Sequence, residues 1–111
     1  MAQHNQLGAE GEKLAIHWLL KKGYLILERN YRFQRAEIDI IAETQDLLVV
    51  VEVKTRNSEF FGDPQSFVTP SQIRNLVKAA DHYINENNIS KEVRFDIIAV
   101  QERQGGADRA L

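Results

Sequence analysis

Residues 47–54 read Leu-Leu-Val-Val-Val-Glu-Val-Lys, and they contain the longest uninterrupted apolar run of the chain, Leu47 to Val51. The valine-rich run is typical of a strand that is covered on both faces, as in the middle of an α/β sheet. An unpaired charge buried in such a strand costs several kcal/mol. Glu52 and Lys54 must therefore be paired, bound to a metal, or placed at the carboxyl end of the strand facing a cleft.

The flanking segments predict the element order αβββαβ. Helical spacing of apolar residues and short β-branched runs give, in chain order, a helix at 7–22, strands at 24–32, 37–42 and 47–54, a helix at 71–86 and a strand at 93–100. Gly23 is expected to end the first helix, Ser71 to cap the second, and Asn87 and Asn88 to end it. The apolar stripe of the second helix, expected to face the core, includes Ile73 and Val77. A strand, a helix and a further strand in series form a right-handed crossover with parallel strands. We predict an α/β fold, a mixed central sheet flanked by helices.

The composition is that of one soluble globular domain. The chain has 111 residues, 43% of them hydrophobic and 27% charged, and it contains no cysteine. We expect one domain at residues 1–103 and a flexible tail at 104–111, which has few residues suited to a core. The longest apolar run is far too short to cross a membrane, and the first residues lack the pattern of a signal peptide. We therefore expect a cytoplasmic protein with no membrane partner.

The net charge of −2 argues against a protein that coats nucleic acid through a broad basic surface. Any contact with nucleic acid must then be local. Arg29, Arg32 and Arg35 lie within seven residues of one another, and Lys54 and Arg56 follow downstream. These side chains are either a local phosphate-binding group or ordinary solvated charges.

Two pairs of ionisable residues fall on single faces of neighbouring strands. Side chains alternate along a strand, so Glu37 and Asp39 share one face of the second strand, while Glu52 and Lys54 share one face of the third. Carboxylates that converge are relieved of their mutual repulsion by a hard cation such as Mg²⁺ or Mn²⁺. With a phosphodiester substrate this set suits metal-dependent hydrolysis. The alternative is a salt bridge between Glu52 and Lys54 beside a solvated acidic face.

Three segments together resemble the YraN-like family of small bacterial proteins. They are Glu37-Ile-Asp39-Ile-Ile-Ala, Val51-Glu52-Val-Lys54-Thr-Arg56 and Arg94-Phe-Asp96. That family is assigned to the restriction-endonuclease-like fold and is similar to archaeal Holliday-junction resolvases. The resemblance covers residues 7 to about 100. It implies a metal-dependent phosphodiesterase core in which Asp39 and Glu52 bind Mg²⁺ or Mn²⁺ and Lys54 stabilises charge or orients water.

The resemblance also implies a third carboxylate. Resolvases of this type carry a helix glutamate spaced between two glycines as Glu12 is between Gly8 and Gly23, so Glu12 becomes a catalytic and metal-binding candidate. A glutamate favoured by the helix dipole is the alternative. The chain departs from the family at Ala36, where Gly is usual, and at Gln72, where Lys is common. Gln72 is either a contact to the substrate phosphate or a residue of the helix cap.

Two functions follow, from different classes. The first is a Mg²⁺- or Mn²⁺-dependent nuclease that acts on DNA, with branched or structured DNA as the substrate the resemblance implies. The second is a catalytically inactive nucleic-acid-binding or protein-interaction module in DNA processing or uptake. For either, the candidate nucleic-acid contacts are Arg32, Arg35, Arg56 and Gln72. Resolvases act as symmetric dimers, so the resemblance also implies a homodimer.

Overall fold

The computed structural model describes residues 2–56, 68–102 and 108–110, and for 2–8, 56, 102 and 108–110 it describes the backbone alone. The elements follow the predicted order with one addition at the end. They are α1 (Ala2–Lys21), β1 (Leu25–Phe33), β2 (Ala36–Glu43), β3 (Leu47–Arg56), α2 (Pro70–Glu86), β4 (Glu92–Glu102) and β5 (Asp108–Ala110). No helix in these ranges is both long and apolar enough to cross a membrane.

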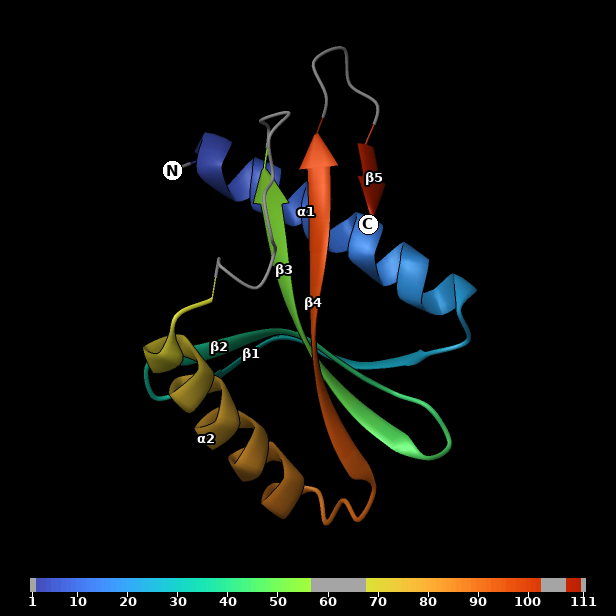
Figure 1. Ribbon diagram of the computed structural model, residues 1–111, viewed down its shortest axis with the longest axis vertical. Helices are drawn as coiled ribbons and strands as arrows, with labels where there is room; N and C mark the ends of the chain where they lie inside the picture. The colour runs from blue at the N-terminus through green and yellow to red at the C-terminus, as the bar shows by residue number, and fades with distance from the viewer. Residues whose placement is uncertain (1, 57–67, 103–107, 111) are drawn as a thin grey trace.

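The sheet is mixed, with strands in the order β1-β2-β3-β4-β5. β1, β2 and β3 are antiparallel neighbours, and β3 and β4 run parallel, as the crossover through α2 predicts. Figure 1 shows β3 and β4 side by side, with α1 crossing near their carboxyl ends and α2 beside their amino-terminal halves. The predicted α/β fold, with a mixed sheet flanked by helices, is confirmed.

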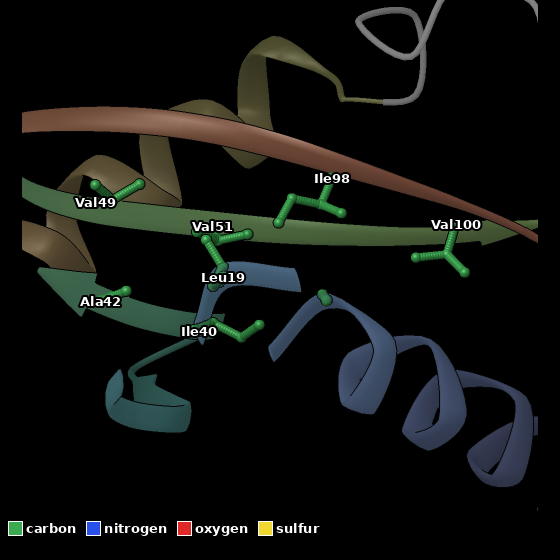
Figure 2. Close-up of a cluster of buried hydrophobic side chains, with 8 residues drawn as sticks. Leu19, Ile40, Ala42, Val49, Val51, Ile98 and Val100 are labelled. Carbon is green, nitrogen blue, oxygen red and sulfur yellow. The ribbon is translucent and has the colours of Figure 1, made fainter. Parts of the chain in front are cut away.

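β3 is covered on both faces, as its valine-rich sequence predicts. Val49 and Val51 belong to the core under α1, which Figure 2 shows with Leu19 reaching toward them. Leu48 and Val50 belong to the second core, under α2. Successive residues of β3 therefore serve opposite cores.

The ends of the helices are set by their caps. Gly23 follows α1 with φ +93°, the conformation predicted for it. The prediction that Ser71 caps α2 was wrong. Thr69 is the N-cap and forms a capping box with Gln72, and Pro70 takes the first helical position, where it loses no hydrogen bond. Asn87 is the C-cap of this helix, as expected.

Two further features differ from the sequence-based expectation. Ile73 and Val77 of α2 were expected in the core but are 49% and 47% exposed, because α2 packs mainly over β2 and β1 and leaves its β4 side open. In the tail expected to be loose, residues 108–110 form β5, which pairs antiparallel with β4. Residues 103–107 and 111 of that tail lie outside the described residues.

Candidate functional site

The candidate site lies where β2 and β3 separate. Their paired residues end at Ile40 and Val51, so Asp39 and Glu52 are the next residue on each strand. Figure 1 shows β1 and β2 turning away from β3 toward α2 beyond this point. Val53 lies beyond the last β2–β3 pair, and its amide donates a hydrogen bond of 2.7 Å to Oδ2 of Asp39. The carboxylate thus replaces a backbone acceptor, and its orientation is fixed.

Glu52 and Lys54 lie together on β3, as the alternation of side chains predicts. Lys54 Nζ is 3.3 Å from Glu52 Oε2, and both side chains are 17% exposed. The ion pair expected as one alternative is therefore present. It does not lie at an edge, because β3 has β2 on one side and β4 on the other. The pair faces the α2 side of the sheet, since Glu52 continues the row of Leu48 and Val50.

The carboxyl groups of Asp39 and Glu52 are difficult to ionise together. Burial, followed by the negative charge of Glu52, raises the pKa of Asp39 from 3.8 to about 7, although the hydrogen bond from Val53 lowers it. Burial also raises the pKa of Glu52, while the charge of Lys54 and hydrogen bonds with Lys54 and Asp39 lower it. Two carboxyls in this state would be stabilised as anions by a cation placed between them.

These carboxyls open into a polar cavity of about 240 Å³ between the sheet and α2. Its walls bring together residues from the β1–β2 turn, from β2, from β3 and from the first two turns of α2. They are Arg35, Ala36, Glu37, Asp39, Glu52, Gln72, Asn75 and Leu76. The structure therefore gathers around one hollow the five charged or polar residues Arg35, Glu37, Asp39, Glu52 and Gln72 named from the sequence, and it adds Asn75, which was not predicted.

Glu12 approaches the site from α1, but it does not line this cavity. Both of its carboxylate oxygens accept hydrogen bonds from Nδ2 of Asn30, at 3.2 and 3.1 Å. Glu12 is nevertheless close enough for its charge to raise the pKa of Asp39. The pairs Arg29–Ile40 and Tyr31–Ile38 on either side place Asn30 opposite Asp39 in the sheet. Asn30 thus joins Glu12 to the rim of the site.

Asn30 was not predicted as a functional residue, although two properties of asparagine make it unusual within a strand. Asn is depleted in strands, and it tolerates positive φ better than most residues. In the structure it has φ 53° in the middle of β1. Strain of this kind gathers at functional positions.

The four candidates for nucleic-acid contact lie in different surroundings. Arg35 and Gln72 line the cavity. Gln72 Oε1 also accepts a hydrogen bond from the amide of Thr69, so Gln72 is a residue of the helix cap, and its contact with a substrate phosphate stays a prediction. Arg32 is exposed and lies 3.7 Å from Glu37. Arg56 ends β3, and its side chain lies outside the described residues. The change from Gly to Ala36 is accommodated, because Ala36 does not have positive φ.

The donor set suits a hard divalent cation held by few protein ligands. In the part of the chain whose side chains are described, no three His, Cys, Asp or Glu residues form a ready cluster for a metal. Mg²⁺ needs no such cluster, because it keeps several waters and is often bound through one or two carboxylates. Asp39 and Glu52 supply those two, with one oxygen of Asp39 already oriented by Val53.

Comparison with known proteins identifies the family. The model of the uncharacterised protein family UPF0102 matches residues 11–100. The chain belongs to the UPF0102 family. This is the YraN-like family that the sequence resembled. The UPF0102 match includes Glu12, Asp39, Glu52 and Lys54, whereas β5 lies beyond it.

Individual UPF0102 proteins match over nearly their whole length. The chain is 54% identical to a UPF0102 protein of Christiangramia forsetii over 106 residues, which are 96% of this chain and 89% of the relative. It is 56% identical to one of Flavobacterium psychrophilum over 104 residues, 94% and 87% of the two chains. With a UPF0102 protein of Bacteroides thetaiotaomicron the identity is 45% over 105 residues, 95% and 87% of the two chains.

Proposed function

We propose that this protein is a Mg²⁺- or Mn²⁺-dependent nuclease that hydrolyses phosphodiester bonds in DNA at the cavity beside Asp39, Glu52 and Lys54. The observation that carries the proposal is the pairing of Asp39 and Glu52 where β2 and β3 separate. Two half-buried carboxyls with raised pKa values face a polar hollow there. Groups perturbed in this way, in a cleft, are typical of functional sites.

Each residue has a role that follows from its surroundings. Asp39 and Glu52 would hold the cation, which when bound lowers the pKa of water and offsets charge developing at phosphorus. Lys54 lowers the pKa of Glu52 and places a positive charge 3.3 Å from its carboxylate, where it would stabilise charge on the phosphate. Glu12 adds negative charge behind Asp39 through its contact with Asn30, which strengthens cation binding.

Arg35 and Gln72 supply the contacts that would position the DNA. Arg35 lies in the β1–β2 turn and Gln72 in the first turn of α2, on the walls of the cavity that holds the carboxyls. A guanidinium is suited to a phosphate because its donors match two oxygens at once. DNA is proposed here in preference to RNA because branched DNA is the substrate that the resemblance implies.

A second function rests on a separate observation. Lys54 neutralises the carboxylate of Glu52 in an ion pair. This ion pair needs no metal ion, so it would be stable in a protein that binds DNA or another protein without cutting. The same structure then serves as a nucleic-acid-binding or protein-interaction module in DNA processing or uptake.

Cleavage assays separate the two functions. Labelled four-way-junction, duplex and single-stranded DNA are incubated with Mg²⁺ or Mn²⁺ and with the unchanged protein, Glu52→Gln or Glu92→Gln. Glu92 is exposed at the far end of the β3–β4 pair, so Glu92→Gln is a control with the same change in charge. We expect cutting that needs the cation, is lost in Glu52→Gln and is kept in Glu92→Gln. No cutting, together with no cation binding by calorimetry, would favour the non-catalytic module.

A further inference from the structure

The candidate site continues into a longer groove along α2. Two more cavities, of about 510 and 570 Å³, follow the first one. The first and middle cavities share Arg35, Ala36 and Asn75, and the middle and outer cavities share Phe33, Gln34 and Lys78. We call this continuous hollow the hairpin groove. It runs between the β1–β2 turn (residues 33–36) and one side of α2.

The helix wall of the hairpin groove is a polar stripe. Gln72, Asn75, Lys78, His82 and Asn85 recur at steps of three or four residues, so they lie along one side of α2. At 1.5 Å per residue, Gln72 and His82 are about 15 Å apart along the helix. The groove is therefore long enough for more than one nucleotide beyond the phosphate at the site.

The charges along the hairpin groove differ from one part to the next. Among the residues that the structure describes, the charged ones lining the middle cavity are Arg35 and Lys78, with no carboxylate. In the outer cavity Lys78 is joined by Asp81 and Glu86. A phosphate is therefore favoured in the middle of the groove and disfavoured at its outer end.

The outer end instead offers an aromatic surface. The rings of Phe33 and His82 are stacked, with centroids 4.1 Å apart and an interplanar angle of 19°. The hydroxyl of Tyr31 and Nδ1 of His82 form a hydrogen bond of 2.8 Å, which fixes the imidazole. Asn85 and Gln34 on the same walls carry amides that can hydrogen-bond a base edge.

We propose that the hairpin groove binds an unpaired DNA strand next to the cleavage site, with a phosphate at Arg35 and Lys78 and a base against Phe33 and His82. In a duplex the faces of the bases are covered by their neighbours, so only an unpaired or terminal base can stack on a protein ring. The inference rests on the proposed function, and it specifies the substrate as DNA in which an unpaired strand leaves a duplex.

The test is binding measured by fluorescence anisotropy in EDTA, where no cutting occurs. A labelled duplex is compared with the same duplex carrying a single-stranded arm. The variants are Phe33→Leu, which keeps an apolar side chain and removes the ring, and Lys78→Gln. Arg74→Gln is the matched control, because Arg74 is exposed on the same helix but lines none of the three cavities.

We expect tighter binding of the armed DNA than of the duplex. Phe33→Leu should weaken binding of the armed DNA by about 5- to 150-fold, with little change for the duplex. Lys78→Gln should reduce the slope of log affinity against log salt by about 0.7. Phe33→Trp should retain armed-DNA binding and show fluorescence quenching by the bound base. Arg74→Gln should leave the preference for the arm unchanged.

The inference is overturned if the unchanged protein has no preference for the arm, or if Phe33→Leu and Lys78→Gln bind it as Arg74→Gln does while circular dichroism shows that they are folded. This failure is distinct from failure of the proposed function. If the protein cuts DNA and Phe33→Leu binds the armed DNA as tightly as the unchanged protein, only the groove proposal is refuted. If binding depends on the arm but no metal-dependent cutting occurs, only the nuclease proposal is refuted.

Discussion

Asn30 on β1 donates its side-chain amide to both carboxylate oxygens of Glu12 on α1, from a backbone position with φ 53°. The contact ties the first helix to the strand opposite Asp39, so the strained residue and the carboxylate are parts of one arrangement. Local strain and a side-chain function at the same residue can be separated by mutation.

Asn30→Ala and Asn30→Gly form such a pair of variants. Both remove the amide, but only Gly accepts positive φ without steric cost. We expect Asn30→Ala to be less stable than Asn30→Gly by about 1 kcal/mol in denaturant unfolding. Both should bind the cation more weakly than the unchanged protein, because Glu12 is no longer held in place. Equal stability of the two variants would show that the backbone of Asn30 is not strained.

Asp39→Asn should change how stability depends on pH. The folded-state pKa of about 7 lies above the ordinary value of 3.8, so between these values the folded chain keeps a proton that the unfolded chain has lost. The free energy of unfolding of the unchanged protein therefore falls as pH rises from about 4 to 7, and it stays low above 7. The variant has no such proton. At pH 8 without divalent cation, we expect it to be more stable by about 1–3 kcal/mol.

Denaturant unfolding at pH 5 and pH 8 in EDTA checks this expectation, with Glu92→Gln as the control. The difference between the two pH values should shrink in Asp39→Asn and persist in the control. If Asp39→Asn has the same pH dependence as the unchanged protein, the raised pKa of Asp39 is contradicted.

Lys54→Met tests whether the ammonium acts in the reaction. The change keeps an unbranched side chain, one atom shorter, and removes its charge, so the rate of cleavage should fall by about 100-fold or more. Cation affinity should change much less, since the carboxylates of Asp39 and Glu52 remain. Because Lys54 lowers the pKa of Glu52, its loss should also move the pH optimum of cleavage upward. Calorimetric titration with Mn²⁺ and single-turnover kinetics measure the two effects. An equal loss of rate and affinity would make Lys54 structural.

Gly11→Ala tests how closely α1 approaches β3. A Cβ atom added at Gly11 would overlap Oγ1 of Thr55, in the carboxyl half of β3. We expect a loss of about 1–3 kcal/mol in the free energy of unfolding, measured by denaturant titration. Combining it with Thr55→Ala should cost less than the sum of the two single changes, because the overlapping atom has gone. Strict additivity would argue against this contact.

The reliable predictions from sequence were those set by local periodicity. The order of elements and the two-sided burial of β3 follow from patterns within a few residues. The cap of α2 was misplaced because both Thr69 and Ser71 suit a cap, and Pro70 between them favours the earlier one. The prediction that Ile73 and Val77 are buried was wrong for another reason. An apolar stripe shows which side of a helix is hydrophobic, but it does not show how far the sheet extends beneath it.

Three features of the site could be predicted from the residues alone: Glu52 and Lys54 share a face, Asp39 lies on the preceding strand, and β3 and β4 are parallel. These results follow from the two-residue period of a strand and the handedness of the crossover. Three relationships needed the packed molecule: the point where β2 and β3 separate, the hydrogen bonds between Asn30 and Glu12, and the stacking of Phe33 on His82 at the outer end of the hairpin groove. Those relationships join residues distant in the chain, and they depend on how the helices and strands pack together, which no local pattern encodes.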